Sequence, residues 1–292
     1  MKFLISKNLL YSFLLSIPLF SMAQNHDPGL PGEDISKGGA AFIGISAGLG
    51  PSNFRDFATS PLIYNGLSGY LALTRLKKNI GKEMEMGIST SIGAYNVDFN
   101  DHLSSSIALT FSIFYSQLYQ LNTLSTGRWN FQAGGMINTT GNVRFNETLM
   151  NNGLGFEFFP TLFGSAKITR DISRSFVKNK KFLFIKYRTK PVDRNVSFRL
   201  NPGLLNSSFR NHFIYLQHST AIDQRLLEDY QYQLFSGFRI SSAVDYNVFL
   251  KNKNAYQFSY LWDAYRSGGK LDKYEMAQHT LKITLLYHTN NK

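Results

Sequence analysis

Cysteine is absent from the 292-residue chain. A lipoprotein needs a cysteine to carry its acyl chains, and a small secreted domain stabilised by disulfides needs cysteine pairs, so both classes are excluded. A linker rich in Pro, Gly or Ser is also absent. The length therefore predicts one large domain rather than two small ones.

Long apolar runs are absent after the first 23 residues, so the sequence predicts no transmembrane helix. At the start, Lys2 and Lys7 precede an apolar run from Leu9 to Phe20, and small residues follow up to Ala23. This order is typical of a cleavable signal peptide over residues 1–23. The alternative is an uncleaved anchor, although the run is shorter than the roughly 20 residues that span a bilayer.

The chain is basic, with 31 Lys and Arg against 19 Asp and Glu. Two of the basic residues, Lys2 and Lys7, lie in the predicted leader, which leaves 29 against 19 and a formal charge of +10 in the mature chain. For an exported protein, the expected anionic partners are outer-membrane lipids and lipopolysaccharide, and not nucleic acid. The sequence indicates no cofactor.

A strict alternation of residue types dominates the mature sequence, and Glu83 to Tyr95 shows it most clearly. Met84, Met86 and Ile88 alternate there with small or polar residues. These 13 residues would extend roughly 43 Å at about 3.3 Å per residue, whereas a strand in a soluble sheet has about 5 to 6 residues. The pattern predicts a long strand with two unlike faces.

Similar segments recur along the chain and number about twelve. They cover residues 40–50, 66–77, 82–97, 104–120, 127–138, 153–168, 181–189, 194–201, 211–220, 231–250, 255–266 and 275–288. Their polar face is rich in Gly and Ser, which suits a crowded concave interior better than the solvated face of a soluble sandwich.

This pattern predicts an all-β fold, an antiparallel up-and-down transmembrane β-barrel of about 12 strands, with 10 and 14 as the limits. In such a barrel, apolar side chains face lipid and polar ones line the lumen. A tilted strand needs about 9 to 11 residues to cross, and an open sheet would leave unpaired edges in lipid. The barrel is expected over residues 40–292, after an N-terminal periplasmic segment at 24–39. The 25 Phe and 16 Tyr fit interfacial girdles.

Connection lengths suggest an orientation, because bacterial barrels combine short periplasmic turns with longer external loops. The expected periplasmic turns are 78–81, 121–126 and 251–254, and the expected external loops are 51–65 and 139–152. Two further connections, 169–180 and 202–210, are long although they fall on the periplasmic side.

The last strand carries part of a known pattern. Thr280, Lys282, Leu285 and Tyr287 occupy a frame of a polar residue, a glycine two positions later, two spaced apolar residues and a final aromatic. Lys282 replaces the glycine, and residues 288–292 continue beyond the aromatic. Essentially the whole mature chain, with its alternating segments, resembles Gram-negative outer-membrane β-barrel proteins as a class. The resemblance implies an outer-membrane location, which agrees with the predicted leader.

Charged residues on the predicted lumen face are nearly balanced in sign. They are Lys167, Lys186, Arg188, Arg199, Arg239 and Lys282 against Glu83, Glu85, Glu157, Asp245 and Asp263. Unpaired charges in a confined lumen are costly, so this set favours paired ladders that fill the barrel. An anion-lined passage is the alternative.

One stretch invites a catalytic interpretation, because outer-membrane lipid hydrolases use His and Ser on barrel strands. His218 and Ser219 are adjacent, however, and would point to opposite faces of a regular strand. Thr220 shares the face of His218, with Asp223 nearby, which keeps a weak catalytic alternative. No metal site is predicted, since His212 and His218 would lie about 20 Å apart.

The sequence therefore predicts a non-enzymatic outer-membrane barrel. Its function is expected to be that of a narrow channel, or of a membrane-embedded binding or assembly component with protein partners at its external loops. The alternatives are a lipid hydrolase of the phospholipase or lipid A deacylase type, and a soluble periplasmic β-protein.

Overall fold

The computed structural model describes residues 39–99, 102–146, 154–182, 184–189, 191–211, 230–268 and 273–289. Every regular element in these residues is a β-strand. None of the described segments forms a helix long and apolar enough to cross a membrane. The predicted leader at 1–23 and all of the segment 24–39 except Gly39 lie outside the described residues.

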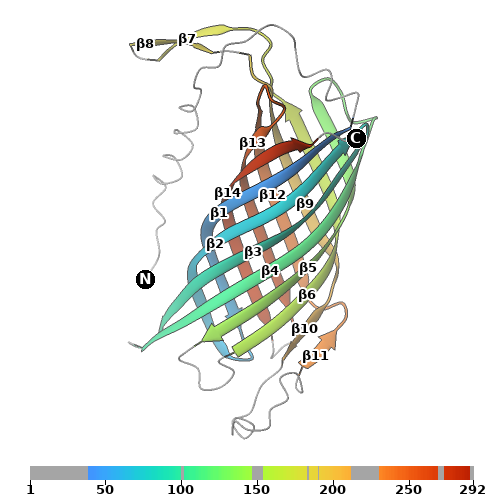
Figure 1. Ribbon diagram of the computed structural model, residues 1–292. Helices are drawn as coiled ribbons and strands as arrows, with labels where there is room; N and C mark the ends of the chain where they lie inside the picture. Colours follow the sequence, from blue (N-terminus) through green and yellow to red (C-terminus); the bar gives the residue numbers. More distant parts are fainter. Residues whose placement is uncertain are drawn as a thin grey trace, which may run out of the picture. The chain divides into compact units, whose positions relative to one another are not determined.

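Ten strands form a closed antiparallel barrel (Figure 1). They are β1 (Ala40–Asp56), β2 (Ser60–Asn79), β3 (Lys82–Phe99), β4 (His102–Gln120), β5 (Trp129–Asn146), β6 (Leu154–Asp171), β9 (Arg194–Asn206), β12 (Phe238–Phe249), β13 (Ala255–Ser267) and β14 (Tyr274–Thr289). The first strand, β1, pairs with the last, β14, and β6 pairs with β9, which completes the ring. The predicted fold class is therefore confirmed.

Two short strands extend one side of the wall. β10 (Ser208–Asn211) follows β9 and pairs with β6, and β11 (Tyr230–Gln233) pairs with β10. The barrel thus has ten strands with two additional outer strands, within the predicted range of strand number.

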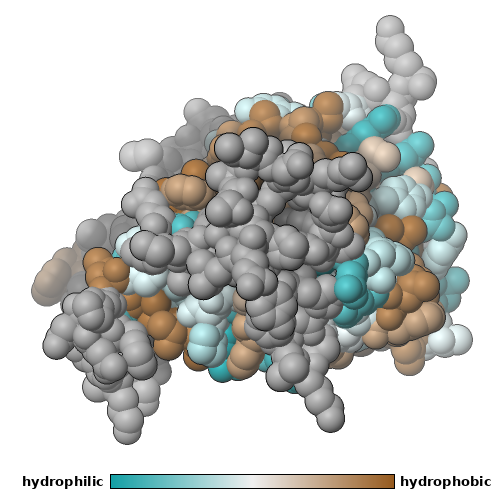
Figure 2. All heavy atoms as spheres, turned by 90° about the horizontal axis from the view of Figure 1, so that it is seen from below, coloured by the Kyte–Doolittle hydropathy of each residue, from teal (hydrophilic) through white to brown (hydrophobic). Residues whose placement is uncertain are grey.

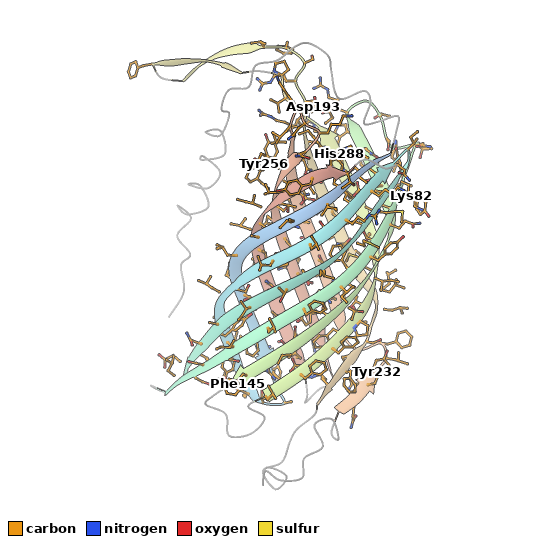
Figure 3. The ribbon with its side chains drawn as sticks, viewed as in Figure 1. Lys82, Phe145, Asp193, Tyr232, Tyr256 and His288 are labelled. Atoms are coloured by element: carbon orange, nitrogen blue, oxygen red, sulfur yellow. The ribbon has the colours of Figure 1, made fainter. Side chains whose placement is uncertain are left out.

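The alternation of residue types in the sequence corresponds to the outer and inner faces of the barrel wall. On β1, Ile43, Ile45 and Leu49 are exposed on the outer face, whereas Ser46 and Ser52 are buried inside. Phe145 on β5 and Tyr256 on β13, both labelled in Figure 3, are also exposed. Successive side chains of a strand point to opposite faces, so a period of two places apolar groups outside and polar groups inside.

Several strands are longer than the sequence predicted. The expected external loop 51–65 is strand apart from a turn at Phe57–Thr59, and residues 139–146 of the loop expected at 139–152 belong to β5. The expected connection 202–210 is likewise strand in β9 and β10. In these segments aliphatic residues are fewer and polar residues interrupt the apolar face, so the hydrophobic alternation became too weak to indicate a strand before the strand ended.

The segment 181–189 is not a barrel strand, which corrects the prediction. β7 (Lys178–Phe182) and β8 (Ile185–Thr189) form a hairpin that pairs only with itself. Residues 174–192 belong to a compact unit separate from the barrel. Each strand has five residues, fewer than the roughly 9 to 11 that cross a bilayer. Of the segment 211–220, only Asn211 is described, as the end of β10.

The two ends of the barrel differ in the parts of the chain that they carry. The terminal end is where β1 begins and β14 ends, and the far end carries the β1–β2 turn at Phe57–Thr59. At the terminal end, β2 and β3 meet in the two-residue turn Ile80–Gly81, in which Gly81 has φ of 69° and so suits glycine. The other short connections at this end, between β4 and β5 and between β12 and β13, also fall where the sequence predicted them.

Candidate functional site in the barrel interior

A layer of aromatic rings fills the interior toward the far end. Tyr274 lies at its centre, with ring centroids 5.5 Å from Phe159, 6.0 Å from Tyr265 and 6.4 Å from Phe54. Phe54 in turn contacts Tyr64 at 5.0 Å and Tyr95 at 4.9 Å. All six rings are buried. Because they come from β1, β2, β3, β6, β13 and β14, their contacts cross the lumen.

Four charged side chains complete this layer. Asp56 accepts hydrogen bonds from Arg144 at 2.5 Å and from Arg210 at 2.6 Å, and Arg144 also donates to Glu157 at 3.1 Å. These side chains are 0–4% exposed. With two carboxylates and two guanidinium groups the set is neutral, which is the arrangement that burial of charges requires.

The ionic and aromatic parts are packed on each other. The guanidinium carbon of Arg144 lies 5.2 Å from the Phe54 ring centroid, and that of Arg210 lies 5.3 Å from the Tyr274 ring. Asn142 donates to the hydroxyl of Tyr265 at 2.7 Å. We call this set the far-end layer. It comprises Phe54, Asp56, Tyr64, Tyr95, Ala108, Asn142, Arg144, Glu157, Phe159, Arg210, Tyr265, Tyr274 and Met276.

Of the charges in this layer, only Glu157 was among the predicted lumen residues. Asp56 and Arg144 lay in predicted external loops, and Arg210 in a predicted periplasmic connection. The signal that could have found them is the continued alternation, for example of Ser52, Phe54 and Asp56 against Asn53 and Arg55.

Arg239 links the far-end layer to the interior beyond it. It donates two hydrogen bonds to Asp263, at 2.6 and 3.2 Å, and one to Thr140 at 3.0 Å. Its guanidinium carbon lies 4.9 Å from the Tyr265 ring centroid. The structure thus brings together two of the predicted lumen charges, on neighbouring strands β12 and β13.

A second ionic group lies nearer the terminal end. Glu83 accepts from Lys167 at 2.5 Å and from Arg199 at 3.3 Å, and Lys78 lies 3.9 Å away. Arg199 also donates to Glu85 at 2.7 Å. Glu83 and Glu85 belong to β3, whereas Lys167 and Arg199 belong to β6 and β9, so these ion pairs also cross the lumen.

Asp245 and Lys282 complete the predicted lumen charges in the barrel. Asp245 accepts hydrogen bonds from Ser259 at 2.6 Å and from Ser197 at 3.4 Å. Lys282 lines the same interior and has no carboxylate within 4.0 Å among the described residues. The remaining two predicted charges, Lys186 and Arg188, belong to β8 and so are not part of the barrel wall.

A cavity lies between the far-end layer and the apolar cluster of Ala40, Phe42, Leu76, Ala255 and Leu286. It offers about 160 Å³ to the centres of water molecules, which is room for several waters. Its lining includes five cationic residues, Lys78, Lys167, Arg199, Arg239 and Lys282, and four carboxylates, Glu83, Glu85, Asp245 and Asp263. The wall of the cavity is therefore polar and close to neutral.

The predicted catalytic alternative cannot be placed, because His218, Ser219, Thr220 and Asp223 lie outside the described residues. The described part of the chain contains no group of three or more His, Cys, Asp or Glu side chains arranged to hold a metal ion.

The outer surface carries apolar and aromatic residues suited to a bilayer. Ile88 and Ile92 on β3 and Leu71 on β2 are all exposed. At the terminal end, the Lys82 ammonium lies 5.5 Å from the Tyr119 ring and the Arg170 guanidinium 5.0 Å from the Trp129 ring. Such basic and aromatic pairs are typical of membrane interfaces. In the end-on view of Figure 2, hydrophobic residues gather at several places around the edge of the molecule.

No protein-family model matches the sequence, and no curated protein matches it significantly. Solved structures with similarity to the chain include the translocator domain of autotransporter NalP from Neisseria meningitidis, with 7% identity, a TM-score of 0.37 and 96% coverage of both chains. The transport unit of autotransporter AIDA-I from Escherichia coli has 9% identity and a TM-score of 0.36, covering 96% of this chain and 97% of that one. A mutant of the monoaromatic hydrocarbon channel TodX has 6% identity and a TM-score of 0.25, covering 88% and 92%.

Proposed function

We propose that this protein is a non-enzymatic barrel of the outer membrane whose lumen is closed, and that it acts as a membrane-embedded binding or assembly component. The closed antiparallel wall satisfies its backbone hydrogen bonds internally, as a membrane-spanning sheet must. Its outer face presents apolar side chains that membrane lipids and lipopolysaccharide would cover, which supports this location.

The far-end layer is the observation on which the proposal rests. An open channel needs a continuous path of water from one end to the other. Here the side chains of nine strands meet inside the wall, and none of the layer's thirteen residues is more than 8% exposed. Because rings and ion pairs interlock, a path for solutes would require several side chains to move together.

Conductance in planar bilayers tests this proposal. The purified wild-type protein should give no stepwise current, because the far-end layer leaves no path for ions. The double variant Phe159→Ala with Tyr274→Ala removes two stacked rings from the centre of the layer and should give stepwise conductance. The matched control is Tyr256→Ala, which removes an exposed ring from the outer face and should remain silent.

Folding of each variant is checked by circular dichroism and by its resistance to detergent-induced unfolding on unheated gels. Stepwise current from the wild type would contradict the closed lumen. A silent double variant with an intact barrel would show that the far-end layer is not the barrier.

A narrow channel is the second candidate, and the polar cavity is the observation that favours it. In that case the far-end layer would be a gate that opens on binding of a partner or solute. The wild type would then conduct. The ion preference of the current should shift toward cations in Arg239→Gln, because this change removes one of the five cationic residues that line the cavity.

A further inference from the structure

The insertion between β6 and β9 carries most of the protein's excess positive charge. Residues 172–193 contain seven basic residues and one acidic residue, Asp193. The basic residues are Arg174, Lys178, Lys180, Lys181, Lys186, Arg188 and Lys190. With Asp193 subtracted, the insertion holds six of the ten excess positive charges of the predicted mature chain, although it is only 22 residues long. Such a concentration indicates an anionic partner.

The tip of the insertion is apolar. Between Lys181 and Lys186 the sequence reads Phe182, Leu183, Phe184 and Ile185. Phe182 pairs with Ile185 in the register of the hairpin, and Phe184 in the turn is 93% exposed. Phe176 and Val177, which lead into β7, are exposed as well. Exposed apolar side chains such as that of Phe184 are unfavourable in water.

The hairpin's own pairing does not balance its charge. Lys181 lies opposite Lys186, and the strands offer no acidic residue as a neighbour. Like charges opposite each other destabilise a strand pair, so these two residues favour an external anion that would neutralise them.

We propose that the β7–β8 hairpin binds the bilayer through anionic phospholipid headgroups, with its apolar tip entering the boundary of the acyl chains. Basic residues near a membrane surface are attracted to anionic lipid, and aromatic tips lie at the level where headgroups meet hydrocarbon. A nucleic acid or an acidic protein would neutralise the cations but would leave the tip in water. A bilayer accommodates both the cations, at its headgroups, and the apolar tip, at the boundary of its acyl chains.

The attachment of the insertion agrees with this partner, and here the inference rests on the proposed membrane-spanning barrel. The chain leaves β6 just after Arg170, whose guanidinium lies over Trp129 at the terminal end. Hydrogen bonds from Ile172 N to Arg194 O at 3.0 Å, and from Arg174 N to Val192 O at 3.3 Å, hold the base of the insertion together. The chain therefore leaves the barrel wall next to residue types that mark the membrane interface.

A fluorescent label at the tip tests the proposal, and the absence of native cysteine makes single labelling direct. The full chain with Phe184→Cys carries a polarity-sensitive dye and is reconstituted into phosphatidylcholine vesicles with or without about 30% phosphatidylglycerol, a level that gives an anionic surface. Acyl chains brominated in both leaflets quench dyes that enter the bilayer. We expect quenching at least about 2-fold stronger with phosphatidylglycerol, because headgroup binding draws the tip in.

Charge reversal should remove this effect. In the Phe184→Cys background, Lys180→Glu with Lys181→Glu should reduce quenching to the level seen in phosphatidylcholine alone. Salt at about 0.5 M should do the same to the unaltered hairpin, since screening shortens the reach of surface charge. Quenching that is equally strong in both lipid mixtures would overturn the anionic partner, and a tip that stays unquenched in both would overturn membrane binding.

Two matched labels separate this inference from the proposed function. A dye at Ile88→Cys, on the exposed face of β3, should be quenched in both mixtures and reports that the barrel is inserted. A dye at Lys251→Cys, in the β12–β13 turn of the terminal end, should be quenched in neither. If the Ile88 dye is quenched and the Phe184 dye is not, the hairpin proposal fails alone. If the Ile88 dye is not quenched, the membrane-spanning barrel fails first.

Discussion

Asp56 shows that one buried carboxylate in the lumen can connect several strands. It stands one position before the β1–β2 turn and reaches partners on β5 and on β10. Arg210 is 154 positions away in sequence, so no local pattern could have linked the two. The sequence predicted that Asp56 lies in an external loop, although the alternation of Ser52 and Phe54 could have indicated its face. Its partners could not be predicted, because they depend on closure of the barrel.

Replacement of Asp56 by Asn is expected to destabilise the protein by about 3–5 kcal/mol, the usual cost of breaking a buried ion pair. The amide retains one oxygen for the Ala58 amide and Arg210, but its NH₂ group faces the donors of Arg144. Equilibrium unfolding by urea in detergent micelles measures the difference. Asp98→Asn is the matched control on an exposed strand position and should change stability by less than about 0.5 kcal/mol. Equal effects of the two variants would mean that the network around Asp56 contributes little.

At the scale of the strand, the sequence was informative about faces and less informative about ends. Leu49 is the last aliphatic residue on the outer face of β1, and Pro51, Asn53 and Arg55 continue that face without a hydrophobic signal. The strand persists to Asp56 because both β2 and β14 still pair with it there. Backbone pairing, which no side-chain pattern records, thus decides where these strands end.

At the hairpin β7–β8, the sequence predicted one longer strand where the structure has two short ones. Residues 181–189 have the length and alternation of one strand, but the chain reverses within them, so that Phe182 pairs with Ile185. The sequence from Phe182 to Ile185 contains none of the usual Gly, Asn or Pro signals, so a turn could not be predicted there.

Two neighbouring positions on β3 provide a direct test of the face assignment. Ile88 is exposed on the outer wall, and Ser89 lines the cavity. Ile88→Arg should reduce the stability of the inserted barrel by about 2–4 kcal/mol, because an arginine near the bilayer midplane is unfavourable. Ser89→Arg should cost less, since its guanidinium enters a polar cavity that already holds Glu85 and Asp263. Folding into lipid vesicles, followed by urea titration, compares them, and the reverse order would mean that the two faces are exchanged.

At the scale of the whole molecule, the even number of strands determines that the first strand begins and the last strand ends on the same side of the barrel. Ten strands return the chain to its starting side, so β1 begins where β14 ends. The alternation predicted a barrel and gave a range for the strand number. The balanced lumen charges favoured paired ladders that fill the barrel, but the sequence could not predict the contacts of the far-end layer, because they join strands across the lumen that meet only after closure.

Labelling of intact cells tests which end faces outward. Because β1 begins and β14 ends at the terminal end, and short turns of bacterial barrels face the periplasm, we expect the terminal end to be periplasmic and the far end external. The structure places Ala58 in the far-end turn and Lys251 in a terminal-end turn, separated by the length of the barrel. With no native cysteine to compete, Ala58→Cys should react with a membrane-impermeant maleimide on whole cells. Lys251→Cys should react only after the outer membrane is permeabilised. The reverse pattern would mean that the barrel is inserted the other way round, and reaction of both sites on intact cells would contradict a barrel that spans the outer membrane.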